Sequence, residues 1–223
     1  MIRLQLILLI LLSTNVFAQS KLSSIDVGNV TSFNNPYELE EHFFNLPKLK
    51  ISNYKIHFRF NFYSAVIDVY SNDSISYEGL ILNQVYKMKS IKPEGQEFPS
   101  LVPDQYVYEI TQLDKEFATK IGRMVFKAKI YTIPSTREIN KWSENWSDCG
   151  GVNFQFKIGE HITEAAYKCP WEQTDEKAET KTLQRFFEIV RANLYQYKYY
   201  EIFQSKLERD KSYSDGVFTF YKD

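Results

Sequence analysis

A β-hairpin framed by the chain's two cysteines is the best-defined element of the sequence. Residues 152–158 alternate apolar and polar side chains, the Gly-Glu pair at 159–160 suits a turn, and residues 162–169 return along the first strand. Counting back from this turn places Cys149 and Cys169 opposite or nearly opposite each other, within the distance that a disulfide bridges. We therefore expect a structural disulfide between these two cysteines, and closing a loop of roughly twenty residues stabilises a fold by about 3 kcal/mol.

The first residues of the chain have the features of a secretory signal peptide. A basic residue precedes an apolar run over 4–12, and small residues stand at positions −3 and −1 of a cleavage site that follows residue 18. Gln19, rather than a cysteine, comes next, so no lipid anchor is expected. We expect a signal peptide over 1–18 and an exported bacterial chain over 19–223, periplasmic or secreted, in a compartment where disulfides persist.

Alternation of apolar and polar residues also predicts strands elsewhere in the chain. The clearest of them begins near Tyr54, and its polar side, which carries Lys55, His57 and Arg59, is expected to face solvent or to bond locally. Strands are expected over about 54–62, 65–70, 75–85, 124–130 and 217–221.

Apolar residues at steps of three and four predict two amphipathic helices. The first begins at Pro103 or Asp104 and ends at Gly122, and the second carries its apolar stripe from Leu183 to Leu194. A short helix is also expected over about 37–45. Residues 195–208 fit a continued helix or an alternating strand equally well, and both alternatives stay open.

These elements together predict an α+β fold with a mainly antiparallel sheet and two amphipathic helices packed on it. The order of elements over 54–121 and over 152–194 is similar, because each runs from strands through a loop to a helix. We therefore expect a single exported α+β domain over 19–223, with two related hairpin–helix units over 54–121 and 152–194.

The segment from Ala65 to Gly79 consists of a strand, an Asp-rich turn and a strand ending in Tyr-Glu-Gly. With the helix and the second hairpin–helix unit that follow, it resembles small exported bacterial domains of unknown function. The resemblance covers residues 54–194 and departs at 62–64, where such domains often carry a paired-cysteine motif. It implies an exported α+β fold and no particular activity.

The charge balance and the hydropathy exclude several classes of function. The formal net charge is −1, so the chain lacks the basic excess that neutralises nucleic-acid phosphates. After residue 18 no apolar run reaches the roughly 20 residues that span a bilayer. We expect neither a nucleic-acid partner nor a transmembrane segment in the mature chain.

The three histidines, His42, His57 and His161, stand far apart and match no metal-binding spacing, so we expect no metal and no cofactor. The motif of a serine nucleophile is missing, and both cysteines are assigned to the disulfide. Carboxylate pairs such as Glu144 and Asp148 suit a hydrolase. Because so many acidic residues offer such pairs by chance, no catalytic residue is assigned.

Trp142 and Trp146 are the most suggestive candidates for a binding site. They lie four residues apart in a polar connection beside the hairpin. Exposed indoles in such a place stack on sugar rings or anchor a protein partner. The alternative is that both rings cover the end of the hairpin as part of a small core cluster.

The leading hypothesis from the sequence is therefore a non-catalytic binding or interaction domain of the bacterial envelope, with a protein or a glycan as its ligand. The alternative is a carboxylate-dependent hydrolase that acts on a cell-wall or extracellular polymer.

Overall fold

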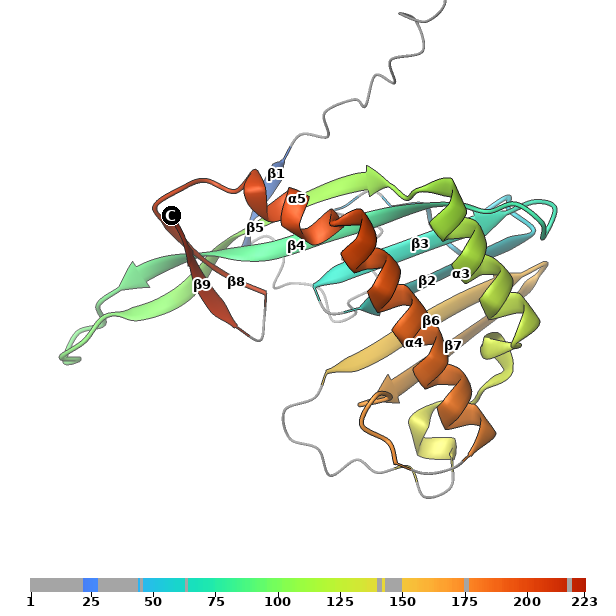
Figure 1. The fold of residues 1–223 in the computed structure, drawn as a ribbon. Helices are drawn as coiled ribbons and strands as arrows, with labels where there is room; N and C mark the ends of the chain where they lie inside the picture. The colour runs from blue at the N-terminus through green and yellow to red at the C-terminus, as the bar shows by residue number, and fades with distance from the viewer. Residues whose placement is uncertain are drawn as a thin grey trace, which may run out of the picture.

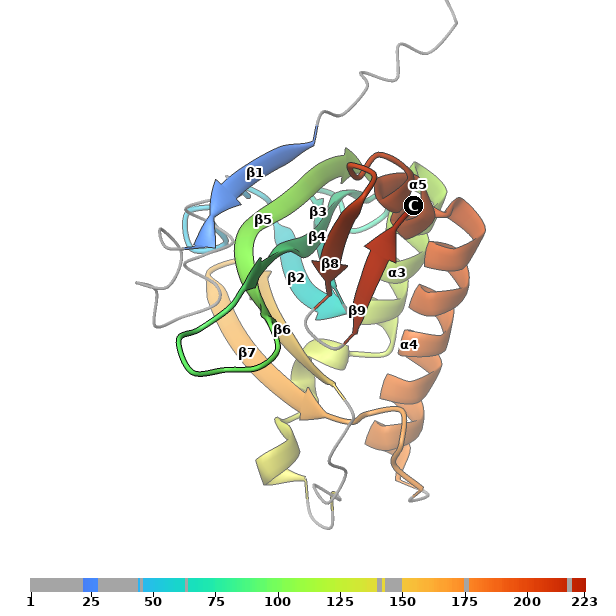
Figure 2. The ribbon, with the colours of Figure 1, turned by 90° about the vertical axis from the view of Figure 1, so that its left-hand side faces the viewer.

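The computed structural model describes residues 22–27, 44, 46–62, 64–139, 142, 150–174, 177–215 and 218–223. These residues form one nine-stranded antiparallel sheet with three α-helices on one face (Figures 1 and 2), so the predicted α+β class is confirmed. The strands are β1 (Ser23–Asp26), β2 (Ile56–Phe62), β3 (Ala65–Ser71), β4 (Glu78–Ile91), β5 (Ser100–Gln112), β6 (Gly151–Ile158), β7 (His161–Lys168), β8 (Lys211–Ser214) and β9 (Thr219–Lys222). The helices are α3 (Lys115–Lys127), α4 (Ala178–Tyr197) and α5 (Tyr199–Ser205), with short 3-10 turns η2 (Ile130–Thr132) and η3 (Thr136–Glu138).

The strand order in the sheet is β1-β5-β4-β3-β2-β6-β7, and the C-terminal hairpin of β8 and β9 is attached to β4. Strand β2 pairs with β3 on one side and with β6 on the other. The two predicted hairpin–helix units therefore share a single sheet. The unit boundary at residue 121 falls inside α3, which continues to Lys127.

Aromatic side chains fill the layer between the sheet and its helices. Phe60 of β2 stacks on Phe154 of β6 with ring centroids 4.8 Å apart, and Phe186 of α4 meets Phe60 edge-on at 5.3 Å. All three rings are buried in the same cluster, to which α3 contributes Phe117. Many of the chain's aromatic residues thus serve interior packing.

The long hairpin of β4 and β5 projects beyond the helices and carries β8 and β9 (Figure 1). A second apolar cluster forms at this junction, where Val85 and Val107 of the hairpin pack with Phe203 of α5 and Tyr213 of β8. The C-terminal hairpin is therefore fixed to the sheet both by strand pairing and by a buried core.

The expected helix from residue 103 to 122 is wrong in its first half, because residues 100–112 form β5. The apolar residues that are spaced three and four apart belong partly to the end of β5 and partly to α3, so the spacing does not come from a single helix. Helix α3 begins only after Asp114, whose side chain accepts the backbone N–H groups of Glu116 and Phe117 as an N-cap. Pro103 fits in β5 because it lies at an irregularity of the register with β4, where a missing N–H is tolerated.

Other expected elements also differ from the structure. The predicted strand over 124–130 is wrong, because α3 runs to Lys127 and η2 follows it. Most of residues 195–208 is helical, since α4 ends at Tyr197 and α5 follows over Tyr199–Ser205. The terminal strand is shifted to β9 and pairs with an unexpected β8. The helix expected over 37–45 lies, except for Phe44, outside the described residues.

The Tyr-Glu-Gly motif has a packing role. The ring of Tyr77 is fully buried against α3 at Gly122, where a Cβ atom would lie 2.3 Å from the ring. A Cβ atom on Gly79 would lie 2.6 Å from the carbonyl oxygen of Asp68. Both glycines therefore allow a close approach that a larger residue would prevent.

One edge of the sheet is partly covered by side chains. Thr136 Oγ1 donates to the carbonyl oxygen of Ala166 and accepts from the N–H of Lys168, while Ser135 Oγ accepts from the N–H of Ala166. The indole of Trp142 donates to the carbonyl oxygen of Lys168 at 2.8 Å. These side chains therefore form hydrogen bonds with the outward backbone N–H and C=O groups in the second half of β7.

Candidate functional site

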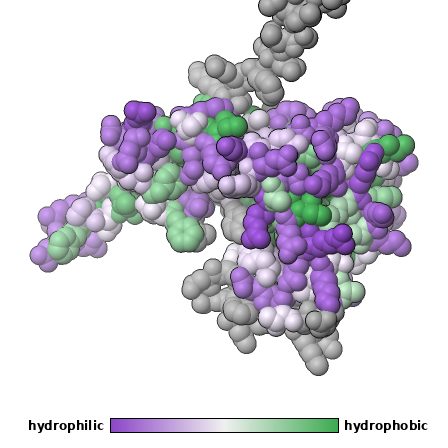
Figure 3. Space-filling model, in the orientation of Figure 1, coloured by the Kyte–Doolittle hydropathy of each residue, from purple (hydrophilic) through white to green (hydrophobic). Residues whose placement is uncertain are grey.

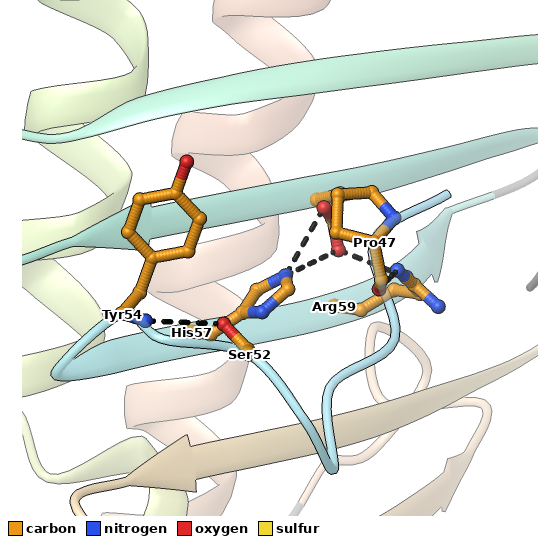
Figure 4. Close-up of polar contacts among 6 residues, drawn as sticks. Pro47, Ser52, Tyr54, His57 and Arg59 are labelled. Carbon is orange, nitrogen blue, oxygen red and sulfur yellow. Dashed lines mark hydrogen bonds and ion pairs between the residues drawn. The ribbon is translucent and has the colours of Figure 1, made fainter. Parts of the chain in front are cut away.

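A buried group of charged side chains lies between β2 and β3. Nε2 of His57 lies 3.0 and 3.1 Å from the two carboxylate oxygens of Asp68, and Arg59 Nε donates to the same carboxylate at 2.9 Å (Figure 4). At most 1% of any of the three side chains is exposed. The expectation that the polar side of this strand faces solvent is wrong for His57 and Arg59, although the imidazole does bond locally.

The chain segment before β2 covers this group. Arg59 Nη2 donates to the carbonyl oxygen of Pro47 at 2.6 Å, and Lys157 of β6 donates to the carbonyl oxygen of Ser52. The ring of Tyr54 stacks on Tyr70 of β3, with centroids 4.2 Å apart. Arg59 and Lys157 therefore anchor this segment to the sheet. The His57–Asp68 pair is buried and offers no surface to a substrate.

The structure places Trp142 in a packed position. Its indole is 8% exposed, its N–H donates to Lys168, and its ring lies 6.2 Å from that of Tyr167. This arrangement corresponds to the alternative in which the ring covers the end of the hairpin. Trp146 lies outside the described residues, so binding by the two tryptophans stays a prediction.

The register of the predicted hairpin is confirmed, because Gly151 pairs with Lys168 and Ile158 with His161. The N–H of Cys169 donates to the carbonyl oxygen of Gly150, next to position 149. Cys169 is fully buried. Cys149 lies outside the described residues, so its disulfide with Cys169 stays a prediction.

Of the remaining polar candidates, only His161 lies among the described residues. His161 is exposed at the start of β7, and no group of three or more metal-binding side chains occurs among the residues that the structure describes. His42, Glu144 and Asp148 lie outside those residues.

A groove that the sequence analysis did not identify runs along α4. It consists of two neighbouring cavities of about 400 and 290 Å3, and Phe62 and Arg191 line both of them. The larger cavity lies between α4, α5 and the first residues of β3 and β4, and the smaller lies between α4 and the segment after β7. We call this pair of cavities the α4 groove.

One stripe of side chains on α4 forms a wall of the groove. Gln184, Glu188, Arg191 and Tyr195 follow each other at steps of four, three and four residues, so they share one side of the helix. The stripe extends about 16 Å along the helix axis. The groove is therefore elongated rather than a closed chamber.

The larger cavity contains a buried amide without a partner. Asn83 of β4 lines it and is 1% exposed, yet its Oδ1 accepts no hydrogen bond from the described residues. Its neighbours on β3 and β5 are Ala65 and Glu109, and Glu109 is paired with Lys206. A buried amide that lacks a partner costs roughly 1–3 kcal/mol, so its place at a cavity is consistent with a role in binding.

Aromatic rings form the base of the smaller cavity. Trp171 meets Phe187 edge-on at 6.1 Å and Phe62 at 6.2 Å, and all three rings line the cavity. Trp171 is only partly buried, so part of the indole is accessible. Tyr195, at the larger cavity, is 75% exposed.

Four carboxylates and one guanidinium line the two cavities. Glu172 and Glu188 belong to the smaller cavity, Glu201 and Asp215 to the larger, and Arg191 to both. Burial raises the pKa of the Tyr199 and Tyr200 hydroxyls, so both rings stay neutral at ordinary pH. Hydrophilic side chains dominate the surface that α4 and α5 present (Figure 3).

Comparison of the chain with protein-family models, with curated proteins and with solved structures finds no match. Among the described residues, no helix has the length and apolar character that crossing a membrane requires.

Proposed function

We propose that the protein is an exported, non-catalytic binding domain of the bacterial envelope and that its ligand occupies the α4 groove. The observation that supports this proposal best is Asn83, which lines the larger cavity and whose buried amide oxygen lacks a partner. A ligand that donates a hydrogen bond there would offset the cost of burying the amide.

The shape of the groove also supports binding. Its cavities approach or reach the lower end of the volume range of small-molecule sites, and each combines apolar rings with a few polar groups. Neither Glu188 nor Arg191 of α4 has an ion-pair partner among the described residues, which leaves both available to a ligand.

The location in the envelope rests on the signal-peptide pattern over residues 1–18, and we propose a periplasmic or secreted protein. We also propose the disulfide between Cys149 and Cys169. It would fix residue 149, and with it the connection after Trp142, to the end of the hairpin.

Site-specific photocrosslinking in the native envelope tests the proposed site. A benzophenone amino acid would replace Tyr195 in the groove or, as a matched control, Tyr221, an exposed tyrosine of β9. We expect a discrete adduct, identified by mass spectrometry, at position 195 and none at position 221. No adduct at 195, or the same adducts at both positions, would contradict the proposal.

A hydrolase that acts on a cell-wall or extracellular polymer is the second candidate, because Glu172 and Glu188 line the same cavity. Paired carboxylates across a bound sugar are the usual arrangement of glycoside hydrolysis. Incubation of the purified chain with peptidoglycan, followed by chromatography of the soluble products, tests this candidate. Products that disappear with Glu188→Gln, while the variant stays folded, would replace the binding proposal by the hydrolase.

A further inference from the structure

We infer that the ligand of the α4 groove is an oligosaccharide without acidic groups, made of neutral or amino sugars. This inference rests on the proposed binding function and specifies its ligand class. It follows from the ring surfaces, the hydrogen-bonding groups, the charge and the length of the groove.

The groove offers aromatic surface in both cavities. Trp171 is partly accessible in the smaller cavity, and Tyr195 is largely exposed at the larger one. The face of an aromatic ring is flat, apolar and partially negative, so it attracts the weakly positive C–H groups on one face of a sugar ring. Two such rings in neighbouring cavities suit a ligand with more than one sugar unit.

The polar groups between these rings are of the kind that bind hydroxyl groups. Arg191 presents several N–H donors in a planar fork, and Glu188 accepts through two oxygens. Asn83, which lines the larger cavity, adds an amide oxygen that has no partner. Planar groups with paired donors or acceptors can bind two adjacent hydroxyls of a sugar. A purely apolar peptide side chain has no groups that would pair with them.

The charge of the groove sets the type of sugar. Four carboxylates face a single guanidinium across the two cavities. An acidic polysaccharide would meet repulsion at both cavities, because partners of like charge disfavour association. A neutral sugar meets none, and an amino sugar gains attraction.

The length of the groove favours an oligomer. The stripe from Gln184 to Tyr195 spans about 16 Å and passes both cavities. A single free sugar would leave one of the two aromatic surfaces unused.

Isothermal titration of the full exported chain with tetrasaccharides of different charge tests the inference. The probes are cellotetraose and chitotetraose as neutral oligomers, the chitosan tetramer as a cationic one, and tetragalacturonate as an anionic one. We expect saturable binding of at least one neutral or cationic probe and none of tetragalacturonate. Tyr195→Ala should weaken this binding at least about tenfold, and the matched control Tyr221→Ala should leave it unchanged.

Three results would overturn the inference: no binding of any neutral or cationic probe, binding of tetragalacturonate that is equally tight, or equal effects of the two tyrosine variants. Because both tyrosines are exposed, circular dichroism is expected to show both variants folded. Glu188→Gln provides a second variant that removes a groove carboxylate without changing its shape.

The titration and the crosslinking experiment separate the two proposals. If position 195 crosslinks to a protein and no saccharide binds, the binding function stands and the glycan inference fails. If position 195 gives no adduct and no saccharide binds, both fail.

Discussion

Charged and polar side chains are used in opposite ways in two regions of this molecule. Between β2 and β3, His57, Arg59 and Asp68 are buried and bonded to one another and to the covering segment. Along α4, Glu188 and Arg191 are exposed beside a cavity without an ion pair between them. Mutual bonding in the first region indicates a structural role, whereas the unpaired groups of the second remain available to a ligand.

The comparison therefore predicts opposite consequences for substitutions in the two regions. Changes in the buried group should lower stability strongly, and changes in the groove should affect ligand binding while stability stays the same or rises.

The largest effect is expected for Asp68→Ala. Removing this carboxylate breaks the buried ion pair with Arg59, which costs about 3–5 kcal/mol of unfolding free energy. Urea denaturation of the full chain measures the loss. The control Asp104→Ala breaks an exposed ion pair with Lys89 and should cost no more than about 1 kcal/mol. Equal losses in the two variants would show that the buried group is not structural.

Trp142 provides the next test, because it was expected as a binding residue and is packed in the structure. Trp142→Ala should lower the unfolding free energy by about 3 kcal/mol through lost packing. Trp142→Phe removes the hydrogen bond to Lys168 and one ring of the indole but keeps an aromatic side chain, so it should cost less, about 1–2 kcal/mol. Thermal or urea unfolding measures both values. Loss of ligand binding with unchanged stability would restore the binding interpretation.

Asn83→Leu should raise the stability of the chain, whereas the substitutions above lower it. Replacing a buried amide that lacks a partner should raise the unfolding free energy by about 1 kcal/mol and abolish the crosslink at position 195. Asn61→Leu is the matched control, since Asn61 Oδ1 accepts the N–H of Asn153 and its loss should destabilise the sheet. If Asn83→Leu destabilises the chain as much as Asn61→Leu, the amide has a structural role.

The smallest effect concerns Asp73, an exposed carboxylate that is bonded to its own turn. The N–H groups of Ile75 and Ser76 donate to it and hold its pKa well below the ordinary value. Its contribution to stability is therefore complete above the unfolded-state pKa of about 4 and is lost as the pH falls toward the lower folded-state pKa. Urea midpoints of the native chain and Asp73→Asn should differ slightly at neutral pH and converge in acid. A difference that is constant with pH would contradict this account.

The alternation of apolar and polar residues and the Gly-Glu pair at the turn were sufficient to predict the hairpin of β6 and β7, including its register. The apolar spacing from Leu183 to Leu194 likewise predicted the position of α4. Both patterns lie within one element, so local periodicity carries the information.

Prediction failed where the pattern crossed elements or depended on tertiary contacts. The apolar residues at the end of β5 and in α3 have, taken together, the spacing of one amphipathic helix. His57 was expected at a polar surface because nothing in its own strand shows that the preceding segment covers it. The α4 groove was missed because its wall is a polar stripe and its other sides come from distant segments; the steps from Gln184 to Tyr195 were its only local signal.

The side chains that occupy the edge of β7 also bear on how copies of this chain behave at high concentration. An uncovered edge strand invites a strand of another molecule and is a common origin of aggregation. The backbone groups of Ala166 and Lys168 are already hydrogen-bonded to the side chains of Ser135, Thr136 and Trp142. An incoming strand is therefore restricted to the first half of β7, which reduces the length of backbone that another copy can pair with.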